Sequence, residues 1–317
     1  MASQEYLAKD ITVLEGLEAV RKKFDVVELS KKIKQKGDVL ILSSQLKIKP
    51  RILNSAYYER RILSTFPYID RSKASALAPL RTNRDLIRFA ERYNLDNLQV
   101  RDIVFLVRKW NNEIQKNPLL LISSDEHEMI IGTLMGDGSI RKRDKNSSIR
   151  FSHSIKQKNY CEEKKNILKE FNLSEFNEKQ TKNNYRQIHT IDFSTRSHPV
   201  FNYYYNLFYK NGIKFVTPEI LKNITPRGLA FWICNDGSYC KKQSYIILCT
   251  NSLSLEEHKL MKNFFKEKFG IYPRIGYRDG KYYYLRFSKD DSKKLIEIVK
   301  PFIPKSMKYK IGEHNDR

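Results

Sequence analysis

Apolar residues recur at three- to four-residue spacing from residue 24 to about residue 118, which predicts a series of amphipathic helices. Two pieces have the helix, short turn, helix rhythm of a helix-turn-helix: ILSSQLKIKPRILNSAYY and LIRFAERYNLDNLQVRDIVFLV. A plain helical bundle with a basic, solvated face fits them equally well. Asn117 and Pro118 end the last helix, because the residue before a proline is pushed out of the α region.

Beyond Pro118 the pattern alternates between helix and strand, and the same succession occurs twice. Each copy predicts an apolar helix, a pair of alternating strands, an amphipathic helix, a hairpin and a closing helix. The matched segments are 130–140 with 229–239, 147–154 with 243–252, 157–171 with 254–269, 185–195 with 272–288, and SHPVFNYYYNLFYKNG with DSKKLIEIVKPFI.

The spacing supports this internal repeat. Asp137 precedes Phe171 by 34 residues (171 − 137), and Asp236 precedes Phe269 by 33 (269 − 236). We therefore expect an α+β fold with pseudo-two-fold symmetry, preceded by a small all-α domain. The expected domains are a leader (1–23), a basic helical domain (24–118), a first repeat (119–215) and a second repeat (216–317).

The charge balance indicates a polyanionic partner. The 317 residues include 59 Lys and Arg against 36 Asp and Glu, a net charge of +23. With 40% hydrophobic residues the chain can build cores, which excludes a disordered basic tail. Nucleic acid is favoured over a membrane surface, because the basic residues are spread along the chain and no stretch approaches the roughly 20 apolar residues of a membrane span.

The N-terminal residues MASQEYLAKDITVLE contain no apolar segment typical of a secretory signal. We expect a protein that is not secreted and works in the cytoplasm, bacterial or phage-encoded, or in an organelle. The four cysteines, Cys161, Cys234, Cys240 and Cys249, form no CxxC pair, so free thiols are expected rather than a zinc site.

The predicted strands are rich in basic residues. An antiparallel sheet buries one face under its helices and presents the other, so the presented faces form either a surface for a DNA duplex or an ordinary solvated surface. The candidate DNA-binding residues are Arg141, Lys142, Arg143, Arg150, Arg186, Lys241, Lys242, Arg274, Arg278, Lys281 and Arg286.

Each repeat opens with an apolar helix that ends in Asp-Gly. Small residues stand four apart in both helices, Gly132 with Gly136 and Ala230 with Cys234, so the two backbones can approach closely. If these helices pack together, the acids that follow them come side by side at the negative ends of two helix dipoles.

Two carboxylates in that position, Asp137 and Asp236, make sense with a divalent cation between them. Taken singly, Asp-Gly after a helix is also an ordinary cap and turn. The equivalent places of the pair in two repeats favour the metal site.

IIGTLMGDGSI and LAFWICNDGSY resemble the two signature helices of the LAGLIDADG homing endonucleases, in the monomeric, two-repeat, intron-encoded branch. RFSHSIKQKNY, NITPRGLAFW and VKPFIPKSMKYKIG extend the resemblance over about residues 122–312. It implies a tandem αββαββα fold, a saddle of strands over the major groove, and double-strand cleavage with Mg²⁺, for which Mn²⁺ substitutes. A ten-residue strand spans about 33 Å, so two such sheets would cover on the order of 20 bp.

The resemblance also implies roles for individual residues. Asp137 and Asp236 match the catalytic acids that bind metal, and Gly138 and Gly237 match the glycines that end the helices. Gly136 and Asn235 belong to the expected metal site but stand where the family often has an acid. Lys310 matches a basic residue that polarises the hydrolytic water or stabilises the phosphate, and its counterpart in the first repeat is Lys214.

Residues 8–22, AKDITVLEGLEAVRK, resemble the start of the DNA gyrase B subunit. The match stops after Lys23, which suggests a reading frame that begins in a gyrase-B-like exon and runs into an intron. The target would then be the intron-free gene near the codons for Lys22 and Lys23. A chance match of an amphipathic helix is the alternative.

Two other functions fit the same fold: an intron maturase that binds intron RNA, and a DNA-binding regulator without catalytic activity. We expect a monomer in each case, because one chain contains both repeats.

Overall fold

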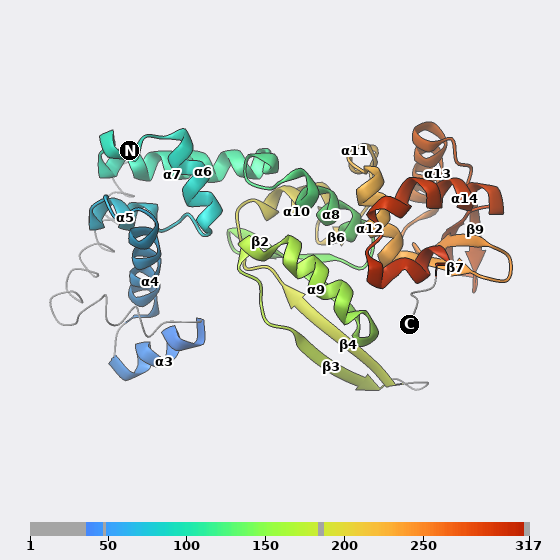
Figure 1. Cartoon of the computed structure of the whole chain (residues 1–317), viewed down its shortest axis with the longest axis horizontal. Coiled ribbons are helices and arrows are strands. Elements are labelled where there is room, and N and C mark those ends of the chain that lie inside the picture. Colours follow the sequence, from blue (N-terminus) through green and yellow to red (C-terminus); the bar gives the residue numbers. More distant parts are fainter. Residues whose placement is uncertain (1–35, 47–48, 183–186, 314–317) are drawn as a thin grey trace. The chain divides into compact units, whose positions relative to one another are not determined.

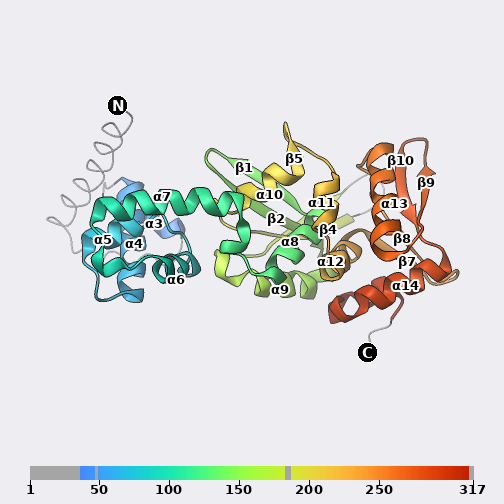
Figure 2. The same ribbon diagram turned by 90° about the horizontal axis from the view of Figure 1, so that it is seen from above.

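A computed structural model describes residues 36–46, 49–182 and 187–313 (Figure 1, Figure 2). The predicted leader, the gyrase-like residues 8–22 and Arg186 lie outside the described residues. The chain divides between Asn112 and Glu113 into two compact units. Within the described part of the chain, no helix has the length and apolarity needed to span a membrane.

The first unit is helical, as predicted. Its elements are α3 (Lys36–Leu46), α4 (Pro50–Thr65), α5 (Arg71–Leu77), α6 (Asn83–Arg92), the 3₁₀ turn η1 (Leu95–Asn97) and most of α7 (Val100–Lys116). Thr82 and Asp85 form a capping box that starts α6, and Trp110 Nε1 donates to Asp85 at 3.3 Å. The second helix-turn-helix candidate becomes α6, η1 and α7.

The second unit contains the αββαββα order twice, which confirms the predicted fold. The first repeat consists of α8 (Ser124–Met135), β1 (Ser139–Arg143), β2 (Asn146–Ser154), α9 (Lys158–Ile167), β3 (Asn177–Lys182), β4 (Gln187–Ser194) and α10 (Phe201–Phe208). The second consists of α12 (Pro226–Asp236), β7 (Gly237–Cys240), β8 (Tyr245–Leu248), α13 (Leu255–Phe269), β9 (Arg274–Arg278), β10 (Tyr282–Arg286) and α14 (Lys289–Val299). Between the repeats lie the short hairpin β5 (Tyr209–Lys210) and β6 (Ile213–Lys214) and helix α11 (Pro218–Lys222).

Both sheets are antiparallel and have the same strand order, β1-β2-β4-β3 and β7-β8-β10-β9. Helices α9 and α10 pack on the first sheet, and α13 and α14 on the second. The apolar side chains beneath the helices make the cores; Phe151 and Phe193, for example, stack with ring centroids 4.6 Å apart. The opposite faces carry arginines: Arg141, Arg143 and Arg150 on the first sheet and Arg274, Arg278 and Arg286 on the second.

The hairpin of the first repeat starts at Asn177, not at residue 185 as predicted. Its first strand, β3, has the sequence NEKQTK, and every residue from 177 to 181 is exposed. The alternating pattern that signals a strand is absent, because β3 buries neither face. The predicted closing helix of this repeat is also shorter, since the chain turns into the β5–β6 hairpin after Phe208.

The two repeats meet along α8 and α12 at backbone distance. A Cβ on Gly132 would lie 2.0 Å from the carbonyl oxygen of Gly228. A Cβ on Gly136 would lie 2.5 Å from the Cβ of Asn235. The prediction that small residues let the helices approach therefore holds for α8, whereas on α12 the closest residue is Gly228 rather than Ala230 or Cys234.

Gly132→Ala tests this contact. A methyl group at 2.0 Å from a carbonyl oxygen forces the helices apart, so we expect the free energy of unfolding to fall by on the order of 1–3 kcal/mol. Gly228→Ala is the matched control, because its Cβ would meet Glu128 O at 3.2 Å and should cost less. Urea denaturation measures both, and equal stability of Gly132→Ala and the wild type would contradict the close contact.

Candidate active site

Asp137 and Asp236 lie at the ends of the two central helices. Helix α8 ends at Met135 with Gly136 as its cap, so Asp137 follows directly, while Asp236 is the last residue of α12. A Cβ on Gly136 would lie 3.0 Å from Asp236 Oδ1, so the glycine leaves room for the carboxylate of the other repeat. The structure thus brings together the two predicted acids.

Both carboxyl groups are harder to ionise than usual. Burial raises the pKa of Asp137, against the opposing effect of Lys164, Lys310 and Lys214. Burial, together with the negative charge of Asp137, raises the pKa of Asp236 to about 7. Two acids at helix C-termini therefore form a site that favours a bound cation.

Two lysines hold the ends of these helices in a pseudo-symmetric way. Lys214 Nζ donates to the carbonyl oxygens on either side of Asp137, Gly136 O at 2.7 Å and Gly138 O at 3.1 Å. Lys310 Nζ likewise donates to the carbonyl oxygens on either side of Asp236, Asn235 O at 3.4 Å and Gly237 O at 2.8 Å. Both predicted lysines therefore lie beside the acid of their own repeat.

These two ammonium groups are partly desolvated. Burial lowers the pKa of Lys214 to about 8, and the nearby carboxylates raise it. Burial likewise lowers the pKa of Lys310. Each lysine supplies positive charge to the negative end of a helix dipole, which offsets part of the cost of placing a carboxylate there.

The glycines after the acids, Gly138 and Gly237, are required by the tight helix ends. A Cβ on Gly138 would lie 2.8 Å from Thr133 O, and one on Gly237 would lie 2.3 Å from Ile233 O. Any side chain there would displace the neighbouring acid. The predicted role of these glycines in ending the helices agrees with this geometry.

One buried cation was missed by the sequence analysis. Lys164 of α9 is fully buried, and its Nζ donates to Asn235 Oδ1 at 3.0 Å and lies 3.0 Å from His153 Nε2. Tyr160, one turn earlier, also donates to Asn235 Oδ1, at 3.3 Å. Burial lowers the pKa of Lys164 to about 7. A signal was present, because Tyr160 and Lys164 stand four apart on the buried face of α9.

The arrangement fits a divalent ion held by the two carboxylates. Mg²⁺ is commonly bound by one or two protein carboxylates, with water and phosphate oxygens as its other ligands. The oxygens of the two neighbouring residues are already engaged, since Gly136 O accepts from Lys214 and Asn235 Oδ1 accepts from Lys164. Among the described residues there is no group of three or more His, Cys, Asp or Glu that could hold a metal ion.

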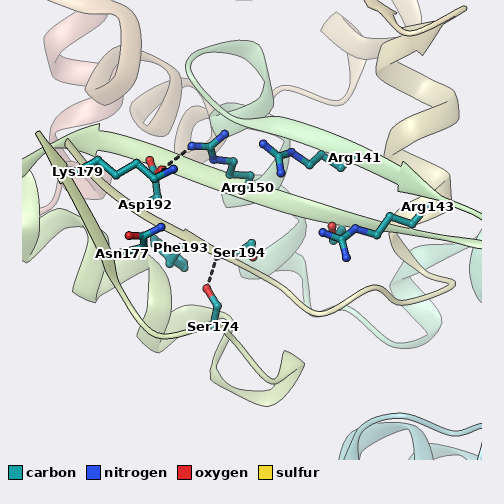
Figure 3. A pocket seen from close by; sticks show the side chains of 10 residues that line it. Arg141, Arg143, Arg150, Ser174, Asn177, Lys179, Asp192, Phe193 and Ser194 are labelled. Carbon is teal, nitrogen blue, oxygen red and sulfur yellow. Dashed lines mark hydrogen bonds and ion pairs between the residues drawn. The ribbon is translucent and has the colours of Figure 1, made fainter. Parts of the chain in front are cut away.

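The predicted basic residues of the first repeat divide between the two faces of its sheet. Arg141, Arg143 and Arg150 line one hollow on the exposed face (Figure 3). Lys142 lies between the first two in sequence and so points to the other face, where its Nζ is 5.1 Å from the centre of the Tyr205 ring.

The predicted basic residues of the second repeat are all exposed. Arg274, Arg278 and Arg286 lie on β9 and β10, and Arg286 is directly opposite Arg274. Lys241 and Lys242 lie in the turn between β7 and β8, and Lys281 in the turn between β9 and β10. Tyrosines lie among them: the guanidinium carbon of Arg286 is 4.2 Å from the centre of the Tyr245 ring.

Asp236→Asn tests the electrostatics of the site. A carboxyl whose pKa is raised by folding binds its proton more tightly in the folded chain, so its ionisation destabilises the fold as pH rises from 3.8 to about 7. In EDTA at about pH 8 we expect the free energy of unfolding of the variant to exceed that of the wild type by on the order of 2–4 kcal/mol. At about pH 5 the difference between the two proteins should be smaller. Urea denaturation at the two pH values measures this.

Glu267→Gln, on the exposed surface of α13, is the matched removal of a negative charge and should leave the pH dependence unchanged. Parallel pH curves for Asp236→Asn and the wild type would contradict a raised pKa at Asp236.

Parts of this chain are similar to known proteins. Residues 127–295 match the LAGLIDADG DNA endonuclease family. The probable intron-encoded DNA endonuclease 3 of Mycosarcoma maydis is 32% identical over 124 residues, which are 38% of this chain and 90% of that protein. The cytochrome b mRNA maturase bI2 of Debaryomyces hansenii is 28% identical over 194 residues, 59% of this chain and 73% of that protein.

Among solved structures, the homing endonuclease I-WcaI bound to its DNA recognition sequence is similar with a TM-score of 0.56 and 25% identity, over 61% of this chain and 88% of that one. The family match covers more than half of the sequence and includes both carboxylate-bearing helices. This chain belongs to the LAGLIDADG DNA endonuclease family.

Proposed function

We propose that this protein is a site-specific homing endonuclease that cuts both strands of a long DNA target by Mg²⁺-dependent hydrolysis. The observation that carries the proposal is the pair of buried carboxylates, Asp137 and Asp236, at the ends of α8 and α12. One acid comes from each repeat, so one chain supplies a pseudo-symmetric site for the two strands of a duplex. The protein then acts as a monomer.

Asp137 and Asp236 would hold the metal, with phosphate oxygens of the DNA and water as the remaining ligands. When bound, such an ion would supply electrostatic stabilisation for the negative charge that develops on the phosphate. Lys214 and Lys310 keep each carboxylate in position through the carbonyls beside it. Their ammonium groups also place positive charge near the reacting phosphate.

The exposed sheet faces would bind the DNA. Arginines on both sheets match the phosphate charge and the acceptor atoms of guanine in the major groove. Two sheets of this kind span on the order of 20 bp, which is long enough for a rare target.

RNA splicing is a second candidate function, because one of the similar proteins is named as a maturase. A maturase would use the basic surfaces for intron RNA and would not need the two acids. One chain can have both functions. Substitution of the two acids distinguishes them, because only DNA cleavage requires the acids.

Asp137→Asn and Asp236→Asn should each lower the rate of DNA cleavage at least ~100-fold, because each removes a ligand for the metal. The assay is Mg²⁺-dependent cutting of duplexes selected from a randomised library, with EDTA as the negative condition and sequencing of the cut ends. Glu267→Gln should cut as the wild type does. Wild-type cutting by both acid variants would refute the assignment, and splicing that survives in them would support a maturase role.

The resemblance of residues 8–22 to the gyrase B subunit supports a specific target. We expect cleavage of an intron-free gyrase-B-like gene near the codons for Lys22 and Lys23, and no cleavage once the intron interrupts that site. Incubating both DNAs with the protein and Mg²⁺ tests this. If the intron-free gene stays intact, the proposed target is wrong. The nuclease activity itself is tested separately by the library assay.

A further inference from the structure

An acid lies among the cations on the exposed face of the first sheet. Asp192 of β4 points between Arg150 of β2 and Lys179 of β3 (Figure 3). Its Oδ2 accepts from the Arg150 guanidinium and lies 3.1 Å from Lys179 Nζ. A carboxylate on a surface that binds phosphates reduces the attraction for DNA, so its place there needs another reason.

The carboxylate is held in one position. Its side chain is only 7% exposed, against 30% for Arg150 and 47% for Lys179, so the cations cover the acid. Burial alone would raise the pKa of Asp192, but hydrogen bonds from Ser152, Arg150 and Lys179 outweigh it and lower the pKa. The carboxylate therefore stays ionised. Within the described part of the chain, Asp192 Oδ1 is buried without a hydrogen-bond partner.

Asp192 in turn fixes Arg150. Arginine presents five N–H donors in a planar fork, and the bond to Asp192 uses one terminal nitrogen, so other donors of the fork are available to a ligand. A guanidinium already held by a carboxylate loses less side-chain entropy when it binds. Arg150 is therefore prepared to make directional hydrogen bonds, unlike a flexible lysine that contacts a phosphate.

The donors of Arg150 match the major-groove edge of guanine. Guanine presents two acceptors there, N7 and O6, and its partner cytosine presents one donor, the N4 amino group. Adenine and thymine present a different order of groups.

We propose that Arg150 reads the guanine of one G·C base pair in the half of the target bound by the first repeat, with Asp192 positioning the Arg150 guanidinium. This inference rests on the proposed function, since it assigns a base to the DNA-binding surface. Arg150 is the specificity-determining residue, and Asp192, which the cations cover, is a positioning residue that holds its guanidinium.

The second sheet has no equivalent pair. Arg150 lies opposite Ser139 and Ser194, and in the second repeat the corresponding position on β8 is Ile247, opposite Ser238 and Arg286. The position that corresponds to Asp192 is occupied by Tyr284, whose ring lies where a Cβ on Gly276 would be. The G·C preference is therefore expected in one half of the target.

The test compares the base preferences of variants in a binding selection from randomised duplexes, followed by Mg²⁺ cleavage of the selected DNA. We expect Asp192→Asn to reduce the preference for G·C at one position about 10-fold, and Arg150→Gln to do so at the same position. The double variant should lose no more than the stronger single variant. Affinity of Asp192→Asn for an unrelated duplex should rise, because a negative charge has been removed.

Glu178→Gln is the matched control. Glu178 lies on β3 opposite the buried Ile191, so its side chain is on the other face of the sheet, where it pairs with Lys158 at 3.3 Å. This variant removes the same charge from the same sheet and should keep the wild-type base preferences.

Three results would overturn the inference: a wild type without a G·C-selective position in one half of its target, a loss of preference spread over all positions in Asp192→Asn, or different positions affected by the two variants. Because the selection reads binding, these results are obtained even when no DNA is cut. If the selected DNA is bound but not cut, the proposed nuclease activity is contradicted. The base preference is still tested, because the selection measures binding.

Discussion

The backbone contact between α8 and α12 determines the rest of the second unit. Gly132 and Gly228 let the two helices touch at their backbones, and near the helix ends Gly136 leaves room for the side chain of Asn235. The direction of each helix then fixes where its last residue lies. Asp137 and Asp236 consequently come together although 99 positions separate them in the sequence (236 − 137).

That proximity is costly for the folded chain and useful for chemistry. Burial removes the water that would stabilise the charged carboxylates, which raises the pKa of both acids, and the charge of Asp137 adds to the rise at Asp236. Both acids also lie at the negative ends of helix dipoles. The lysines that bond the flanking carbonyls, Lys214 and Lys310, reduce the cost without neutralising the carboxylates through direct ion pairs. A cation bound by the two acids would relieve the remaining repulsion, and its binding would then be coupled to the stability of the helix ends.

The sequence predicted this centre well because its determinants are local and repeated. Asp-Gly after an apolar helix, found twice at matching positions, pointed to both acids, and the repeated succession of hydrophobic patterns predicted the order of the elements. Two features could not be found in this way. Strand β3 has no apolar alternation because it buries nothing, and Gly228 meets Gly132 only through the crossing of two helices. Contacts between distant segments depend on packing angles that a pattern along one segment does not contain.

The two halves of the site share a backbone but differ in their side chains. Around Asp236, the side chain of Asn235 is tied to Lys164 and Tyr160 of the first repeat, so a side chain of α9 braces the end of α12. Around Asp137, the corresponding residue is Gly136, which has no side chain to be held. The two acids, the lysines that bond the carbonyls beside them, and the backbone contact of the central helices are common to both halves. A duplicated unit that keeps these contacts can change the side chains on each sheet face independently. Two halves with different sheet faces can then match an asymmetric DNA sequence.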